Sequence, residues 1–233
     1  MPRTHWWRPI AVLALTLPLA TMAVPAGASS PSLATVLSRA KASMLKAGRV
    51  HIAVRVTGTT PSTVTADIGR TSGREAYTAG TATVTVLVTP TSAYLRGNAV
   101  GLTKLVGLTT SQQRKVGKRY LKMGKGTSQY TTFSSNLTVA ALAGLLPSNK
   151  NVKMSRNRRG EYLLTWTTAK SSTTAASTTT LTLSKGSRIL PLSEDVRSAS
   201  GGGTTTFSHW GQRFVVSAPP SSDTVAYSAV MTG

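Results

Sequence analysis

The chain has 233 residues, no cysteine, and 27 lysines and arginines against 6 acidic residues, which gives a formal net charge of +21 at pH 7. Without cysteine no disulfide forms, so stability must come from a buried apolar core. The charge excess favours contact with polyanions such as anionic lipid headgroups or cell-wall polymers. Nucleic acid is not expected as a partner, because only 6% of the residues are aromatic and stacking platforms for bases need rings.

The N-terminal segment has the pattern of a secretory signal peptide. It carries Arg3 and Arg8, an apolar run from Ile10 to Val24, and Ala-Gly-Ala at positions 26–28. Threonines and a proline interrupt the run, which is also short for a membrane span of roughly 20 residues. We therefore expect a signal peptide over residues 1–28 and a single domain over 29–233, with an uncleaved anchor as the alternative.

The first element of that domain is an amphipathic helix. Ser30 and Pro31 resemble an N-cap followed by proline at the first helical position, and the helix should end near Gly48. Its apolar residues recur at steps of three and four and form one stripe: Leu33, Val36, Leu37, Ala40 and Met44. Such a helix either covers a sheet or closes one side of a ligand cavity.

Alternating strands follow the helix. Residues 50–57 alternate apolar and polar positions, and the same period appears at 64–68, at 84–88 and in a short run around Tyr94. Short turns between them predict an antiparallel meander. Residues 100–118 are expected to form one or two short helices, followed by a strand from Tyr120 to Met123 and a largely apolar helix that stops at Pro147.

The last third returns to strands at "EYLLTWTTA", "TTTLTLSKG" and "RILPLSEDVRSAS", with a long hairpin arm or a disordered loop at 171–180 and a turn at 201–203. A closing hairpin is expected from Thr204 to Ala218, turning at Trp210 and forming one edge of the sheet. We predict an α+β fold in which a strongly curved antiparallel sheet of roughly eight to ten strands covers a few helices.

Catalytic and metal-binding patterns are weak. The only neighbouring carboxylates, Glu194 and Asp195, would point to opposite faces of a strand and so make a poor acid–base pair. His51 and His209 could be drawn into a Ser-His-Asp arrangement, but no G-x-S-x-G motif accompanies them. We therefore expect no enzyme activity, no metal and no cofactor.

Two basic clusters could contact phosphorylated headgroups or wall polymers, although a plain solvated face is the simpler interpretation. The first cluster, around "RKVGKRYLKMGK", comprises Arg114, Lys115, Lys118, Arg119, Lys122 and Lys125. The second, around "KNVKMSRNRR", comprises Lys150, Lys153, Arg156, Arg158 and Arg159.

Several stretches in order resemble one known family. After the signal peptide come "VLSRAKASMLKAGRVHIAVRV", "AYLRGN", "GKRYLKM", "LTVAALAGLL", "GEYLLTW", "LTLSKGSRILPLSED" and "TTFSHWGQRFVVSAPP". This set resembles the LppX/LprG family of actinobacterial lipid-carrier lipoproteins, whose fold is related to the LolA/LolB half-barrel. The family is typically anchored by a lipidated cysteine after the signal, and this chain has none.

The resemblance implies a half-barrel with an apolar cavity that carries acylated lipids or glycolipids of the cell envelope without catalysis. It implies a secreted or extracytoplasmic envelope protein with basic residues at an anionic headgroup, and the absence of cysteine indicates that this chain is not lipid-anchored. The alternative is an envelope protein that binds anionic wall polymers through its basic clusters and has a solid core. Candidate cavity residues are Ile52, Val54, Val56, Val84, Val86, Val88, Tyr162, Leu164, Trp166, Leu181, Leu183 and Phe207.

Overall fold

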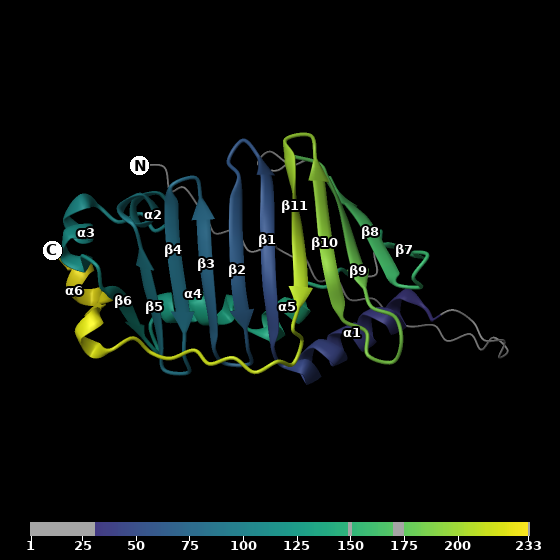
Figure 1. Ribbon diagram of the computed structural model, residues 1–233, viewed down its shortest axis with the longest axis horizontal. Coiled ribbons are helices and arrows are strands. Elements are labelled where there is room, and N and C mark those ends of the chain that lie inside the picture. The colour runs from purple at the N-terminus through teal and green to yellow at the C-terminus, as the bar shows by residue number, and fades with distance from the viewer. Residues whose placement is uncertain (1–30, 149–150, 170–174, 233) are drawn as a thin grey trace.

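The computed structural model describes residues 31–148, 151–169 and 175–232, and its strands form one open sheet (Figure 1). The sheet has twelve strands in the order β12-β6-β5-β4-β3-β2-β1-β11-β10-β9-β8-β7. All neighbours pair antiparallel except β12 and β6, which are parallel. The strands are β1 (Val50–Gly58), β2 (Ser62–Ile68), β3 (Gly73–Ala79), β4 (Ala82–Val88), β5 (Ser92–Gly97), β6 (Tyr120–Gly124), β7 (Lys153–Arg156), β8 (Tyr162–Thr168), β9 (Ser177–Leu183), β10 (Pro191–Ser198), β11 (Gly201–Ser208) and β12 (Thr224–Ala226).

Two meanders meet at the centre of this sheet. β1 to β6 follow one another in space, and so do β7 to β11, because short connections favour pairing between sequential strands. The seam between them is the pairing of β1 with β11, in which Ile52 lies opposite Phe207 and Val54 opposite Thr205. The sheet is therefore continuous although its central pair joins distant parts of the chain.

The predicted closing hairpin is wrong. β11 ends at Ser208, pairs with β1 and β10 in the middle of the sheet, and does not form an edge. His209 (φ 53°) and Gly211 (φ 79°) turn the backbone out of the sheet, and the Gly211 N–H donates to the Arg49 carbonyl. Residues 212–220 then run without strand pairing along one end of the sheet towards β12 (Figure 1).

The glycines before β11 also differ from expectation. Gly201 to Gly203 are strand residues paired with both β1 and β10, and the turn lies at positions 199–200 instead. Gly201 has a φ of 137°, a conformation that side-chain-bearing residues rarely adopt. Glycine here allows the two neighbouring backbones to approach closely, and it leaves the sheet surface bare of side chains.

Three further strands were not predicted: β3, β7 and β12. Residues of β3 such as Arg74 and Tyr77 alternate, but the strand carries few branched apolar side chains. β7 lies inside the second basic cluster, where Lys153 and Arg156 are strand residues at the sheet edge. Charged side chains are typical of edge strands, since they discourage pairing with other chains.

The long helices cover one face of the sheet, called here the inner face (Figure 1). The helices are α1 (Leu33–Ala47), α2 (Ala99–Lys104), α3 (Thr110–Val116), α4 (Ser128–Asn136), α5 (Val139–Gly144) and α6 (Tyr227–Met231). α1 is capped by Ser32, whose Oγ accepts from the Thr35 N–H, and it ends at Gly48 with φ 68°. The helix therefore starts two residues later than Ser30 and Pro31 indicated. No helix in the described ranges combines the length and apolarity of a membrane span.

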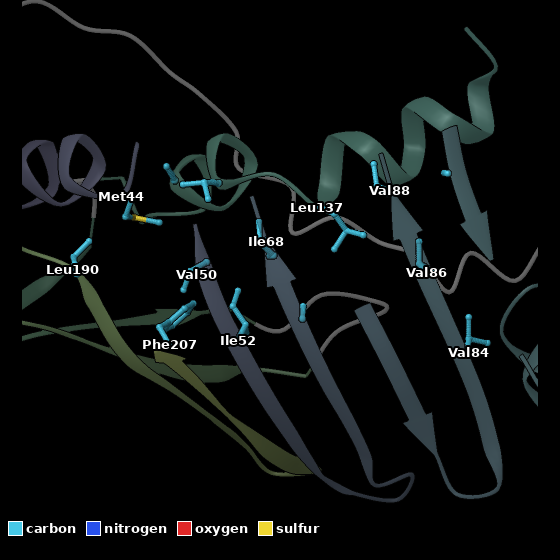
Figure 2. Packing of buried hydrophobic residues seen from close by; sticks show 14 of the residues in the cluster. Met44, Val50, Ile52, Ile68, Val84, Val86, Val88, Leu137, Leu190 and Phe207 are labelled. Carbon is cyan, nitrogen blue, oxygen red and sulfur yellow. The ribbon is translucent and has the colours of Figure 1, made fainter. Parts of the chain in front are cut away.

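The core lies between the inner face and the helices. Met44 of α1, Leu137 after α4 and inward residues of the strands form one apolar cluster, part of which is shown in Figure 2. Inward and outward positions alternate along each strand, as in β4, where Val84, Val86 and Val88 are buried. The fold is thus α+β, as predicted, with the helices on the apolar side of an open antiparallel sheet.

Candidate functional site

A pocket of about 350 Å³ lies between the inner face of β8–β11 and the helices α1 and α5. We call it the helix-side pocket. Its helical wall consists of Met44 and the end of α5. The helix stops before Pro147, because proline disfavours helical geometry at the residue that precedes it. The sheet supplies the other walls. The lining residues are Met44, Leu142, Leu145, Leu146, Pro147, Trp166, Thr168, Ser177, Thr179, Leu181, Pro191, Glu194, Val196 and Phe207.

A second pocket, of about 570 Å³, lies over the central strands next to the first. We call it the glycine-edge pocket, because Gly201 to Gly203 form part of its floor. Ser177, Glu194 and Val196 line both pockets, so the two adjoin along β9 and β10. The remaining lining residues are Val54, Val56, Thr57, Ala175, Ser198, Ser200 and Thr205. Together the pockets make a groove that is apolar near α5 and rich in hydroxyls and bare backbone at its other end.

Glu194 is the one ionisable residue among the described lining of the two pockets. It lies opposite the buried Leu181 in the register of β9 and β10, which places its side chain on the inner face. Its carboxyl has no hydrogen-bond or ion-pair partner in the described parts of the chain. Burial raises the pKa of Glu194 above its ordinary value.

Glu194 and Asp195 face opposite sides of the sheet, as the sequence indicated. Asp195 lies on the outer face and accepts a hydrogen bond from Arg197 Nε at 3.1 Å. Glu194 was not predicted to line a pocket. The segment "PLSEDVRS" forms a strand in which Glu194 occupies an inward position. The sequence alone does not show which of its alternating positions face inward, because that depends on the register of β10.

The predicted cavity residues divide into two groups. Trp166, Leu181 and Phe207 line the helix-side pocket, and Val54 and Val56 line the glycine-edge pocket. The others are buried in the packed cluster and line neither pocket: Ile52, Val84, Val86, Val88, Tyr162, Leu164 and Leu183. Residues of α5 and the loop after it, which complete the wall, were not predicted because the sequence does not show which strands this helix covers.

The two basic clusters lie far apart. The first cluster spans α3, the turn after it and β6 near one edge of the sheet, whereas Lys153 and Arg156 belong to β7 at the opposite edge (Figure 1). Lys150 lies outside the described residues. Within the described chain no lysine or arginine lines either pocket, and neither cluster contains an ion pair with a carboxylate. The clusters therefore do not converge on one surface beside the groove.

A polar cluster occupies the outer face of β1–β3. Asp67 is buried, and its two carboxylate oxygens pair with His51 Nδ1 at 2.7 Å and Arg74 Nε at 2.5 Å. Burial acts to raise the pKa of Asp67, but the hydrogen bonds and charges of His51 and Arg74 outweigh it and hold that pKa below its ordinary value. His209 lies beside His51, with 5.8 Å between the ring centroids.

This cluster does not have the geometry of a hydrolase triad. Nucleophilic catalysis needs a hydroxyl within hydrogen-bond reach of the histidine base. The described hydrogen bonds of His51 include none to a hydroxyl, and the Ser208 hydroxyl lies 3.3 Å from His209 Nδ1 at an exposed position. Nor do three or more potential ligands gather into a metal site in the described residues.

No family model and no curated protein matches the chain. Among the solved structures that resemble it are the following three. LprF from Mycobacterium bovis shares 15% identity with a TM-score of 0.46, over 82% of this chain and 99% of that chain. The lipoprotein LppX of Mycobacterium tuberculosis shares 16% identity with a TM-score of 0.42, over 80% of this chain and 100% of that one. An uncharacterized conserved protein from Thermus thermophilus shares 10% identity with a TM-score of 0.41, over 82% and 96%.

Proposed function

We propose that the protein is a non-enzymatic binder or carrier of acylated lipids, with the acyl chain in the helix-side pocket. The observation that carries the proposal is the pocket itself, whose walls are Leu, Val, Trp, Phe, Met and Pro side chains apart from a few hydroxyls and Glu194. Small-molecule sites commonly measure 300–1,000 Å³ and are mostly apolar with few polar groups. Both pockets fall in that range. The family resemblance of the sequence motifs points to the same class of ligand.

The physics of the pocket favours a chain-like ligand. Each CH₂ group moved from water into an apolar site gains about 0.8 kcal/mol. Leu145 is 49% exposed and lines the pocket, so apolar surface at the rim is left in contact with water when the pocket is empty. An acyl chain between α5 and β8–β10 would cover that surface and the walls beneath it.

The proposal places this binder outside the cytoplasmic membrane, on the signal peptide predicted at residues 1–28. Lys118 and Arg119 at one end, and Arg158 and Arg159 at the other, pair with no carboxylate in the described chain and would attract anionic membrane surfaces or wall polymers. Because attachment through charge alone is reversible and screened by salt, binding to anionic vesicles should fall between 0.05 and 0.5 M NaCl, concentrations that bracket a Debye length of about 10 Å.

The polymer-binding alternative predicts a different response. A variant with four basic residues changed to Gln (Lys118, Arg119, Arg158 and Arg159) should lose its association with anionic wall polymer whether the protein is a lipid carrier or only a polymer-binding protein. A lipid carrier should still contain its lipid after this change, whereas a polymer-binding protein contains none. An organic extract of the variant therefore separates the two functions.

The direct test is native mass spectrometry with organic extraction of the protein purified from its own host, comparing wild type with Val196→Trp. Val196 lines both pockets, so an indole at this position should fill the groove and remove bound lipid. Arg197→Trp is the matched control, since the neighbouring position is exposed on the other face. Wild type and the control should carry an acylated ligand and Val196→Trp should not. Equal ligand in all three would contradict the assignment.

A further inference from the structure

The groove contains a carboxyl that has no counter-charge among the described residues. Glu194 lines both pockets at the place where they adjoin, and it faces inward opposite Leu181 and Thr205. No described Lys, Arg or His shares the lining. The chain as a whole is basic, with 27 lysines and arginines against 6 acidic residues, so this acidic group lies within a positively charged molecule.

An unpaired carboxylate in such surroundings is costly, because burial removes solvating water and no cation of the described chain replaces it. The cost is relieved by protonation or by a cation that enters with a ligand. An anionic headgroup would do the opposite, since two like charges at close range in a partly dry site repel strongly. The expectation of basic residues around an anionic headgroup therefore does not fit this position.

The arrangement of the groove fixes where a ligand cation would lie. On one side of Glu194 are Leu181, Trp166 and Phe207, which suit an alkyl chain. On the other side are the hydroxyls of Ser198, Ser200 and Thr205, which suit polar groups, beside Val54, Val56 and the side-chain-free Gly201 to Gly203. A group attached to the end of the chain meets Glu194 at the boundary between these two environments.

We propose that Glu194 determines headgroup selectivity by pairing with an ammonium group at the end of the ligand's alkyl chain and by excluding anionic amphiphiles from the groove. An ammonium partner also favours the ionised carboxyl, and hydrogen bonds to charged groups are stronger than neutral ones. The inference rests on the proposed lipid-binding function and names the class of ligand for the same site.

The experiment uses three probes of equal chain length: dodecylamine, dodecanol and dodecanoate, titrated by calorimetry at pH 7.5 in 0.15 M NaCl. Wild type should bind dodecylamine about tenfold more tightly than dodecanol, because one charge-assisted hydrogen bond is worth roughly that factor. Dodecanoate should bind most weakly. This order of affinities distinguishes a local effect of Glu194 from the overall charge of the protein. A net charge of +21 acting at long range would favour dodecanoate over dodecylamine.

Glu194→Gln keeps the size of the side chain and removes its charge, so the variant should bind dodecylamine and dodecanol equally and gain affinity for dodecanoate. Asp195→Asn makes the same change of charge on the opposite face and should behave like wild type. Glu194→Met gives a second neutral side chain of similar length if Gln impairs folding, which circular dichroism reports.

The outcomes separate the two proposals. Equal affinity of wild type for dodecylamine and dodecanol, tighter binding of dodecanoate, or an amine preference that survives in Glu194→Gln would overturn the role of Glu194 while leaving lipid binding intact. If none of the three probes binds the wild-type protein, the groove is not an alkyl-binding site and both proposals fail.

Discussion

The two halves of the sheet use the same alternating pattern to build different interiors. In the half formed by β2–β6, inward residues such as Val86, Leu95 and Leu121 are at most 2% exposed and pack into one cluster. In the half formed by β8–β11, the inner face meets α1 and α5 across two pockets. Apolar alternation therefore identifies an inner face without showing whether that face is filled.

The difference arises from side-chain size and helix coverage. α4 contacts β4, β5 and β6, and α2 contacts β4 and β5, so helices lie directly on the packed half. Inward positions of β10 and β11 include Ser198, Gly201 and Gly203, which offer little volume to fill the space beneath the helices. Because protein interiors are otherwise close-packed, this unfilled volume distinguishes the inner face of β8–β11 from that of β2–β6.

The largest difference in stability between the two halves is expected when a leucine side chain is truncated in each. Leu121→Ala removes a fully packed residue (1% exposed) and should lower the free energy of unfolding by about 3–4 kcal/mol, because it creates a new cavity. Leu181→Ala removes a wall that already borders a pocket and should cost about 2 kcal/mol, near the transfer term alone. Urea denaturation of both variants measures the difference. Equal costs would mean that the two interiors are packed alike.

A smaller effect is expected on the outer face. Asp67→Asn removes the charge that pairs with His51 and Arg74 and should cost about 1–2 kcal/mol, an estimate reduced because the Arg74 side chain is 59% exposed. The pKa of Asp67 lies below its ordinary value, so its contribution is present above about pH 4 and is lost as the pH falls through the folded-state pKa.

Denaturation at pH 7 and at pH 3 checks this dependence. The gap between wild type and Asp67→Asn should narrow in acid. A gap that stays constant, or widens, would show that the carboxylate charge is not what stabilises this part of the sheet.

The smallest effect concerns Glu75, an inward residue of β3 that lies between Ala66 and Val86. Burial raises its pKa, and it has no hydrogen-bond or ion-pair partner in the described residues. The folded state therefore holds the proton more tightly than the unfolded state, and ionisation above the raised pKa destabilises the fold. Glu75→Gln should be slightly more stable than wild type at pH 8.

Below about pH 4 that advantage should disappear, because both states then hold the proton. Thermal unfolding of the two proteins at pH 4 and pH 8 tests the sign. Since Glu75 lies in the packed half, away from the residues that line the two inner pockets, the same variant should leave binding of alkyl probes unchanged.

Much of the strand pattern could be predicted from local sequence. The runs containing Ile52, Val86 and Leu164 alternate strongly, and each is a strand in the structure. β7 and the placement of β11 could not be predicted. The charged residues of β7 obscure its strand pattern. The place of β11 depends on its pairing with β1, which lies about 150 residues earlier, and short-range periodicity carries no information about such a pairing. The triple glycine, typical of a turn, is a strand only because β1 and β10 flank it.

The site was less predictable than the fold. Trp166, Leu181 and Phe207 were expected at a cavity, but nothing in their own segments distinguishes them from Leu164 and Leu183, which are fully buried. The distinction depends on where α5 crosses the sheet, which is a tertiary property. Glu194 became recognisable only when its register against β9 and β11 placed it inside the groove.

The seam between β1 and β11 also sets the order in which the molecule can mature. A chain synthesised from its N-terminus presents β1 early, yet the partner on the second side of β1, residues 201–208, is among the last segments to appear. Until then each meander keeps an unpaired central edge, and unpaired edges recruit foreign strands. The groove over β9, β10 and β11 is complete only after this late pairing. A nascent chain would therefore be unable to form this groove before its synthesis is nearly finished.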